Sequence, residues 1–366
     1  MMLTALGLMS GTSLDGVDVA LIETDGREVA SYGPSGYRPY TEQERHVLRQ
    51  ALGEAASLRN RGARPGILRE AERLVTLAHA EAVAAFTSQH GLLNQEIDIV
   101  GFHGQTVLHR PELRLTVQIG DGAALAKAIH IPVVYDLRAA DVEAGGQGAP
   151  LVPVYHRALA QTLHRDGPIA VVNIGGVSNI TYIEGDGLIA CDTGPGNALL
   201  DDFMLRVMKQ PFDVEGRLAA RGRADESWIA RALELPFFSL PPPKSLDRND
   251  FTALKLPELV PADGAATLTA FTAAAIARIV PLLPKAPKSW IICGGGARNL
   301  TLMRMLRERF APAEVEAADA LGWSADAMEA QAFAYLAARG MKGLPLSYPS
   351  TTGVPMPMTG GVIARP

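Results

Sequence analysis

The chain carries one pattern twice, an apolar strand that leads through a glycine- and hydroxyl-rich turn into a second strand. The first copy, ALGLMSGTSLDGVDVALIETDG, begins at Ala5, and the second, AVVNIGGVSNITYIEGDG, begins at Ala170. Apolar runs bounded by such turns are typical of strands joined in hairpins. The copies lie too far apart for a solenoid repeat, so the pattern favours duplication of a whole domain. Coincidence is the alternative, because strand-glycine-strand segments are common.

Segments with strand and helix patterns alternate along the rest of the chain. Arg69–Gln89 has apolar residues at helical spacing and is followed by Gly91, a residue typical of a helix end. Ile97–Phe102 is an apolar run of the length of a buried strand. We expect further strands at Thr116–Ile119 and Trp290–Cys293, and helices at Ala265–Leu283, Asn299–Phe310 and from Ser324 to Gly340. This alternation predicts an α/β fold with largely parallel strands, and Arg59–Gly66 and Leu240–Arg248 are predicted surface loops.

Length and composition set limits on the class of protein. The 366 residues, 48% of them hydrophobic and 20% charged, suffice for two domains with substantial cores. A net charge of -5 without a basic run argues against nucleic-acid binding. The cysteines, Cys191 and Cys293, are too few for a disulfide framework or a structural zinc site and favour a reducing compartment. No positively charged leader and no apolar run of ~20 residues is present, so we expect a cytoplasmic protein without a membrane contact.

The turn of the first copy, Ser10–Asp18, has the chemistry of a phosphate-binding loop. Glycines let main-chain N–H groups approach an anion, hydroxyls add donors, and carboxylates can hold a hydrated cation. The residues concerned are Gly11, Thr12, Ser13, Leu14, Asp15, Gly16, Val17 and Asp18. No Gly-Lys-Ser/Thr follows, so the segment is neither a P-loop nor a dinucleotide fingerprint. An ordinary hairpin with capping aspartates is the alternative.

Two further glycine clusters occur in the second half of the chain. Asn173–Thr181 (NIGGVSNIT) pairs Gly175 and Gly176 with hydroxyl and amide side chains. Two such hairpins that face each other across a cleft can grip a polyphosphate from both sides. Cys293–Asn299 (CGGGARN) follows an apolar strand and precedes a predicted helix, and it contains Gly294, Gly295, Gly296 and Asn299. Its glycines suit close approach of a flat ring or a phosphate near a helix N-terminus, so we predict nucleotide contact there.

Asp192 is the strongest candidate for a catalytic group. It follows the apolar run Leu188–Cys191 and precedes the turn Thr193–Gly196, with Asn197 placed to cap the next helix. This position puts a carboxylate at the carboxyl end of a strand, where open α/β sheets bind their ligands. A general base must lie within hydrogen-bond reach of the proton it removes, which a rigid mount favours. Initiation of the turn is the alternative role for Asp192.

Three segments are predicted to line the site of a polar substrate. Gly101–Arg110 (GFHGQTVLHR) offers His103 and Gln105 after a buried strand, although a lone histidine is more often structural than catalytic. Tyr135–Pro153 combines Asp136, Arg138 and Asp141 with a glycine-rich loop, where Arg138 would pair with a substrate carboxylate or with one of these aspartates. The alanine-rich helix from Ser324 carries Glu329, a carboxylate that is costly to bury without a partner.

Together these motifs resemble the ordered signatures of the anhydro-N-acetylmuramic acid kinase family. The matching strings are LMSGTSLDGVDVAL, GFHGQT, DLRAADVEAGGQGAPLVP, NIGGVSNIT, DTGPGNALLDD, CGGGARN and DAMEAQAFAYLA, and they extend over essentially the whole chain. The resemblance implies two duplicated actin-like ATPase domains, of the ribonuclease H-like α/β fold, that flank a central cleft. The expected domains are residues 1–125 and 126–366, with the core of the second repeat starting near residue 168. Glu143 departs from the family pattern, in which a small residue more usually precedes AGGQG.

The resemblance also implies a reaction in cell-wall recycling. Water opens the 1,6-anhydro bridge of anhydro-N-acetylmuramic acid while ATP, with Mg²⁺, phosphorylates O6. By this resemblance Asp192 is the base, Gly11–Asp18 is the ATP phosphate loop, and the protein is a homodimer whose partner is a small-molecule sugar. The alternatives are a kinase for another amino sugar and an actin-like ATPase that switches the binding of a partner.

Overall fold

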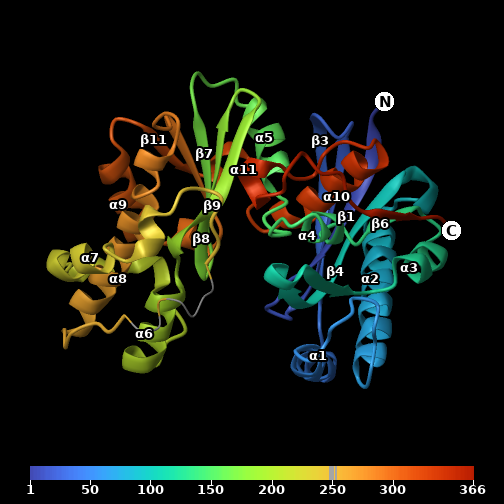
Figure 1. The fold of residues 1–366 in the computed structure, drawn as a ribbon, viewed down its shortest axis with the longest axis horizontal. Coiled ribbons are helices and arrows are strands. Elements are labelled where there is room, and N and C mark those ends of the chain that lie inside the picture. The colour runs from blue at the N-terminus through green and yellow to red at the C-terminus, as the bar shows by residue number, and fades with distance from the viewer. Residues whose placement is uncertain (247–250, 252–253) are drawn as a thin grey trace. The chain divides into compact units, whose positions relative to one another are not determined.

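The computed structural model describes residues 1–246, 251 and 254–366. Residues 247 and 248 of the predicted surface loop Leu240–Arg248 lie outside this part of the chain. The described chain divides into two compact units, which are considered separately below (Figure 1). Unit 1 comprises Met1–Thr162 and Ala327–Pro366, and unit 2 comprises Leu163–Asp326.

A mixed sheet forms the centre of unit 1. Its strand order is β12-β6-β4-β1-β2-β3, and β5 pairs with β4 beside this path. The strands are β1 (Leu3–Ser10), β2 (Gly16–Thr24), β3 (Val29–Pro39), β4 (Ile99–Arg110), β5 (Leu115–Ile119), β6 (Val133–Tyr135) and β12 (Val362–Ala364). β1 runs antiparallel to β2 and parallel to β4, and β4 runs parallel to β6. The carboxyl ends of β1, β4 and β6 therefore share one edge of the sheet.

Helices pack against the sheet of unit 1. They are α1 (Glu42–Ala55), α2 (Leu68–His90), α3 (Gly122–Ile129), α4 (Ala139–Glu143), α5 (Pro153–Gln161), α10 (Met328–Met341) and α11 (Pro349–Thr352). α10 lies against β1, β4 and β2 at very short range. A Cβ on Gly7 would lie 1.7 Å from the Ala330 carbonyl oxygen, and one on Gly101 would lie 2.0 Å from that of Phe333. Glycine is thus required at both positions by this helix–sheet contact.

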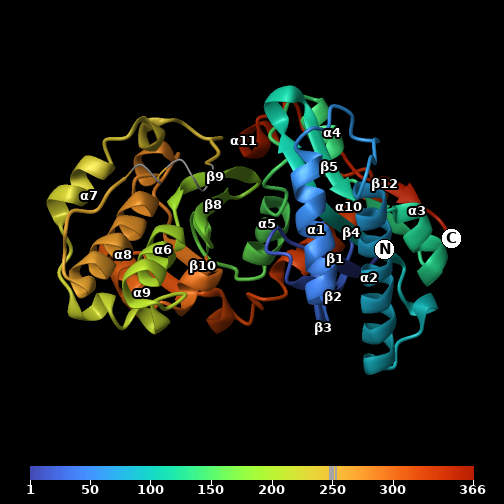
Figure 2. The same ribbon diagram turned by 90° about the horizontal axis from the view of Figure 1, so that it is seen from below.

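Unit 2 contains a five-stranded sheet of the order β11-β10-β7-β8-β9. The strands are β7 (Ile169–Ile174), β8 (Val177–Glu184), β9 (Gly187–Pro195), β10 (Ser289–Cys293) and β11 (Glu314–Ala317). Its helices are α6 (Ala198–Met208), α7 (Glu226–Ala232), α8 (Pro261–Ala277) and α9 (Leu300–Phe310). α8 contacts both α6 and α9, and the three lie together in Figure 2. The apolar segment Pro261–Leu282 is long enough to cross a membrane, but 72% of its most apolar window is buried in this unit, as expected of a core helix.

The two sheets share one topology, which confirms the predicted α/β class and the duplication. In each unit the first three strands form an antiparallel meander. Two later strands, β4 and β6 in unit 1 and β10 and β11 in unit 2, add in parallel on the side of the first strand. The order 5-4-1-2-3 therefore holds for β6-β4-β1-β2-β3 and for β11-β10-β7-β8-β9. This shared order agrees with the two duplicated α/β domains expected from the sequence.

Two sequence predictions need correction. The strands are not largely parallel, because the short glycine turns join neighbouring strands directly, and only an antiparallel pair accepts so short a connection. The helix expected from Ser324 begins only at Met328, after a turn.

Three other elements have different ends from those predicted: β4 continues to Arg110, β9 continues to Pro195, and α8 ends at Ala277. His103 and Asp192 therefore lie within strands and not after them. The remaining predicted helices and strands agree with the structure to within a few residues.

The division into units also differs from the expected boundary at residues 125 and 126. β6 pairs with β4, and α10 packs on β1, so the segments 126–162 and 327–366 belong to unit 1. Unit 2 starts at Leu163, close to the expected start of the second repeat near residue 168.

Candidate functional site

The turn between β1 and β2 presents hydroxyl groups on a rigid base. Thr12 and Ser13 are exposed, whereas Leu14 and Val17 are buried and anchor the turn in the core of unit 1. Asp15 uses Oδ1 to accept from Ser13 Oγ (2.7 Å) and from the Gly16 N–H (3.0 Å). A Cβ on Gly16 would lie 2.4 Å from the Arg38 carbonyl oxygen, so this glycine serves contact with β3. The exposed residues of the turn are Thr12, Ser13 and Asp15, and Gly11 beside them is half-buried.

Buried side chains hold this turn from below. Ser10 Oγ donates to Gln105 Oε1 (2.6 Å) and lies 3.0 Å from the Tyr40 hydroxyl. Gln105 Nε2 donates in turn to the Gly11 carbonyl oxygen (3.0 Å). Gln105 is 1% exposed, so its amide is used within the protein. It was predicted to line the substrate site, and the structure places it as a support of the turn.

His103 links Ser10, below the turn, to Arg138 in the loop after β6. Its Nδ1 lies 3.2 Å from the Ser10 carbonyl oxygen, and its Nε2 accepts from Arg138 Nε at 3.2 Å. Nδ1 therefore carries the proton, because the other nitrogen must accept. Burial, followed by the neighbouring Arg138 charge, lowers the pKa of His103 to about 3 and keeps the ring neutral.

Arg138 is half-buried, and its guanidinium donates to groups within unit 1. Besides His103 it donates to the Gly148 carbonyl oxygen (2.9 Å), and its guanidinium lies 5.8 Å from the centre of the Phe333 ring. The expected pair with Asp136 or Asp141 is not formed, because Asp136 pairs with Arg61 and Asp141 accepts from Thr352 Oγ1 (2.6 Å). Burial raises the pKa of Glu329 on α10, and the Arg138 charge opposes this rise.

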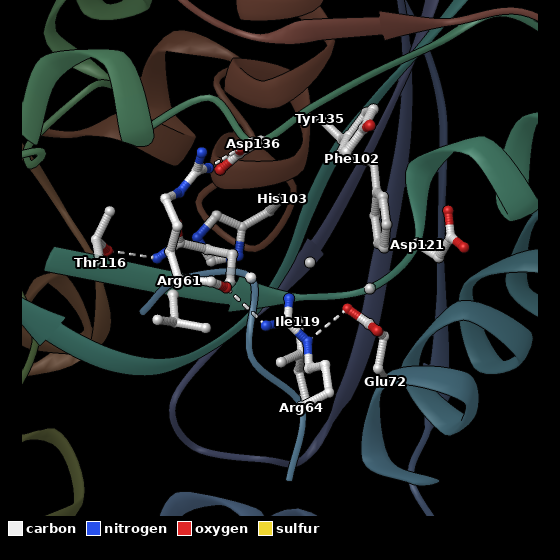
Figure 3. Close-up of a pocket in the computed structure, with 15 residues that line it drawn as sticks. Arg61, Arg64, Glu72, Phe102, His103, Thr116, Ile119, Asp121, Tyr135 and Asp136 are labelled. Atoms are coloured by element: carbon white, nitrogen blue, oxygen red, sulfur yellow. Dashed lines mark hydrogen bonds and ion pairs between the residues drawn. The ribbon is translucent and has the colours of Figure 1, made fainter. Parts of the chain in front are cut away.

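A cavity of about 270 Å³ adjoins His103 within β4 and lies beside the carboxyl end of β6 (Figure 3). Arg61 reaches across it to Asp136, and Arg64 pairs with Glu72 at 2.8 Å. Asp121 caps α3 by accepting from the N–H groups of Ala123 and Ala124. The other lining residues are Gly62, Phe102, Gly104, Thr116, Val117, Gln118, Ile119, Gly120 and Tyr135.

The arginines of this cavity were missed in the sequence, where Arg59–Gly66 was predicted to be an ordinary surface loop. The available signal was three arginines within six residues of a glycine-containing loop that has no acidic residue. Asp136, by contrast, was predicted and lies in the cavity with a positive φ of 57°. Such a backbone conformation is uncommon outside glycine and is frequent at functional sites.

The second glycine turn, between β7 and β8, is held by main-chain groups. The Gly175 and Gly176 carbonyls accept from the N–H groups of Asn197 (2.7 Å) and Gly196 (2.9 Å). A Cβ on Gly196 would lie 2.2 Å from the Gly175 carbonyl oxygen. The turn after β9 is thereby locked onto the turn after β7.

The glycines that follow β10 join the same end of the unit 2 sheet. A Cβ on Gly294 would lie 2.3 Å from Asn173 Oδ1, and one on Gly296 would lie 2.5 Å from the Ile174 Cβ. Asn299 caps α9, with Oδ1 accepting from the Leu302 N–H at 2.9 Å. A cavity of about 240 Å³ lies here, lined by Asn197, Leu200, Asp201, Phe212, Asp213, Glu215, Gly295, Arg298 and Asn299. Gly295 leaves the main chain bare at one point of this cavity, which allows close approach of a flat heterocycle.

Asp192 lies on β9, opposite Asn179 of β8. Its Oδ2 accepts from the Leu246 N–H at 2.7 Å. Burial raises its pKa to about 6, while the Leu246 N–H and the Lys244 charge lower it. A carboxylate with a pKa near neutrality is suited to proton transfer. Lys244 and Leu246 were missed in the sequence, because nothing local links a proline-rich loop to a distant strand.

No group of three or more histidine, cysteine, aspartate or glutamate side chains arranged to hold a metal ion occurs among the described residues. Mg²⁺ that accompanies a triphosphate usually keeps several waters and takes only one or two protein carboxylates. Asp15 and Asp18 in the β1–β2 segment match that requirement in type and number.

Comparison with known proteins gives a full-length match. The family model described as anhydro-N-acetylmuramic acid kinase matches residues 3–366. An anhydro-N-acetylmuramic acid kinase of Bradyrhizobium diazoefficiens is 78% identical over 367 residues, covering 100% of both chains. One from Nitrobacter winogradskyi is 73% identical over 366 residues, again with 100% of both chains covered. Among solved structures, a ROK family glucokinase from Streptomyces griseus in complex with glucose and AMPPNP shares 13% identity. Its TM-score is 0.40, covering 91% of this chain and 99% of that chain.

Proposed function

The chain belongs to the anhydro-N-acetylmuramic acid kinase family, and we propose that it phosphorylates anhydro-N-acetylmuramic acid with ATP. The products are N-acetylmuramate 6-phosphate and ADP, in the recycling of cell-wall sugar. Identity of 78% over the full length supports this substrate. Within the structure, the observation that carries the proposal is the Asp192 carboxylate at the edge of its sheet, with a pKa raised to about 6 by burial.

Asp192 acts as the general base in this proposal. A water molecule attacks the anomeric carbon of the sugar and gives its proton to Asp192. The bond between that carbon and the bridging O6 breaks, and O6 forms a new bond to the γ-phosphorus as ADP leaves. Transfer of this kind depends mainly on positioning and on neutralisation of phosphate charge.

The nucleotide is assigned to the glycine segments. The tip of the β1–β2 turn, Gly11–Ser13, offers main-chain and hydroxyl donors for phosphate, and Gly175 and Gly176 offer a second turn of the same type. The cavity beside Gly295 and Asn299 has the size and, at Gly295, the bare main chain for the base. Bound Mg²⁺ would supply neutralisation of phosphate charge, with Asp15 and Asp18 as the nearby carboxylates.

The sugar is assigned to the cavity of about 270 Å³ in unit 1. It is polar, it lies at the ligand-binding edge of the sheet, and its His103 directly contacts the residues that support the phosphate turn. Arg61, Asp136 and Gln118 offer donors and acceptors for hydroxyl, amide and carboxylate groups. Glu329 would act on this site through Arg138.

Two measurements test the proposal. In a coupled ADP assay, the anhydro sugar should be turned over and ordinary N-acetylmuramic acid should not. In ¹⁸O-labelled water, label should enter the anomeric hydroxyl of the product, because water opens the ring bridge. ADP formation without incorporation of label would contradict the hydrolytic mechanism and favour a kinase for an open sugar.

The two alternative functions find less support. Each relative named above carries the same enzyme name, which speaks against another amino sugar and against an ATPase switch. We further propose a cytoplasmic homodimer, on the basis of the family resemblance. Sedimentation of the purified protein across a range of concentrations would test the dimer.

A further inference from the structure

A proline-rich loop segment of unit 2, Lys244–Leu246, holds Asp192 through both its main chain and its carboxylate. The Asp192 N–H donates to the Lys244 carbonyl oxygen at 2.9 Å. The Leu246 N–H donates back to Asp192 Oδ2 at 2.7 Å. The segment is thus hydrogen-bonded to β9 at Asp192, the candidate base.

Lys244 is itself fixed in place. Its Nζ donates to the Phe237 carbonyl oxygen at 3.0 Å and lies 4.6 Å from the centre of the Phe237 ring. Phe237 packs against Phe238 and Phe251 of the unit 2 core. A lysine with these contacts is a fixed positive charge, whereas most lysines move freely in water.

The two carboxylate oxygens of Asp192 differ in their hydrogen bonds. Oδ2 is occupied by the Leu246 N–H, and within the described part of the chain no hydrogen bond is formed by Oδ1. A base that must take a proton from water needs one free oxygen and a fixed orientation. One oxygen is therefore used for orientation and the other stays available for chemistry.

We propose that Lys244 is a positioning residue for Asp192, which orients the base through the segment Lys244–Leu246. This role rests on the proposed function, in which Asp192 must be ionised to act. The residue touches neither substrate nor nucleotide in this account, and it acts only through Asp192.

The positive charge of Lys244 changes the pKa of Asp192 in a defined direction. The groups that set the pKa of Asp192 are its own burial, the Leu246 N–H and the Lys244 ammonium, in that order. Cys191, the other titratable neighbour, stays a neutral thiol because burial raises its pKa to about 12. Removal of the ammonium removes a force that lowers the pKa of Asp192, so the base becomes protonated at a higher pH.

The test compares Lys244→Met, Lys244→Arg and wild type by the pH dependence of kcat/KM for the anhydro sugar. Wild type should lose activity below a midpoint near pH 6, the pKa of Asp192. In Lys244→Met we expect this midpoint to rise by roughly half to one pH unit, as for the loss of one partly screened charge. The KM for ATP should stay unchanged, and Lys244→Arg should restore the wild-type midpoint.

Lys285→Met is the matched control, since Lys285 is 69% exposed and pairs with Glu184 on the surface at 2.5 Å. Its pH profile should match that of wild type.

A Lys244→Met enzyme that is folded by circular dichroism and has an unchanged acid midpoint would overturn the proposal. So would a uniform loss of activity at every pH, which indicates a purely structural role. If wild type itself does not turn over the anhydro sugar, the proposed function fails instead. In that case the Asp192 carboxyl resonance, titrated by NMR in wild type and Lys244→Met, still decides whether Lys244 lowers its pKa.

Discussion

The two units have the same strand order but stabilise their glycine turns in different ways. In unit 1 the turn after β1 is supported by side chains, with Ser10 and Gln105 buried beneath it. In unit 2 the turn after β7 is closed by main-chain hydrogen bonds to Gly196 and Asn197. A duplicated topology therefore fixes where a turn lies, but it leaves open which groups hold it.

The third strands of the two sheets, β3 and β9, differ in the role of the residues that they carry. β3 ends next to Tyr40, whose N–H donates to the Asp15 carbonyl oxygen and whose hydroxyl contacts Ser10. β9, the third strand of unit 2, carries Asp192 before its end at Pro195. The third strand thus leads to a supporting residue in one unit and carries the proposed base in the other. The following predictions test this asymmetry.

The largest effect is expected at the proposed base. Asp192→Asn keeps the shape of the side chain but removes its capacity to accept a proton, so turnover should fall by roughly 10²–10⁴. ATP affinity should be retained, because Asp192 is not assigned to nucleotide binding. Steady-state kinetics and ATP titration of the purified variant measure both quantities.

Glu308→Gln, which changes an exposed carboxylate paired with Arg304 at 2.7 Å, is the control and should behave as wild type. Near-normal turnover of folded Asp192→Asn would remove the asymmetry between β9 and β3, because neither strand would then carry a base.

The sequence allowed most of the fold to be predicted, because hairpin turns and helical periodicity are local signals. Duplication followed from the two glycine turns, and α2 and β10 were located within a few residues. The strand directions were wrong, since alternation of elements suggested parallel pairing where short turns enforce antiparallel pairs.

The sequence indicated which polar residues to consider, but it did not indicate which groups they contact. Gln105 was predicted to line the substrate site, and only the fold shows that its amide is hydrogen-bonded to Ser10 and Gly11. Lys244 and Arg61 were missed, because each meets its partner through tertiary packing of a loop. Residues far apart in sequence carry no local pattern that would reveal such a pair.

Acid should destabilise unit 1 more than unit 2. Burial lowers the pKa of His79 and His156 to about 4, and that of His103 to about 3, whereas unit 2 contains only His164. Each unfolded histidine takes up a proton near pH 6.5, so the stability that these groups contribute is present above pH 6.5. It is lost as pH falls toward 4. At pH 5.5 we expect a loss of about 1.4 kcal/mol for each, or about 4 kcal/mol in unit 1.

Tryptophan fluorescence can separate the two units, because Trp228, Trp290 and Trp323 all lie in unit 2. Urea unfolding followed by fluorescence should shift little between pH 7.5 and 5.5, while the far-ultraviolet circular dichroism transition should move to lower urea. If the fluorescence and circular dichroism transitions shift by the same amount between pH 7.5 and 5.5, the assignment of acid sensitivity to unit 1 is contradicted.

A pair of glycine substitutions should separate the units in stability. Gly7→Ala places a Cβ 1.7 Å from the Ala330 carbonyl oxygen, so α10 must move, at a cost of about 3 kcal/mol or more. Gly175→Ala meets nothing closer than 3.7 Å and should change stability by less than about 1 kcal/mol. Urea unfolding of both variants measures the difference. Equal free energies of unfolding for the two variants would mean that α10 can move away from β1 without loss of stability.

The smallest effect, and the most specific, is expected where side chains support the phosphate turn. Gln105→Met removes the donor to Gly11 and the acceptor for Ser10 while it keeps the volume. Loss of a buried hydrogen-bonding partner costs about 1–3 kcal/mol, and because the turn is proposed to bind ATP, we expect a roughly tenfold rise in the KM for ATP. The KM for the sugar should change by less than about twofold, because Gln105 does not line the proposed sugar cavity. Gln89→Met, on the exposed face of α2, is the surface control. A rise in the sugar KM alone would return Gln105 to the substrate site, where its position in the sequence first suggested it.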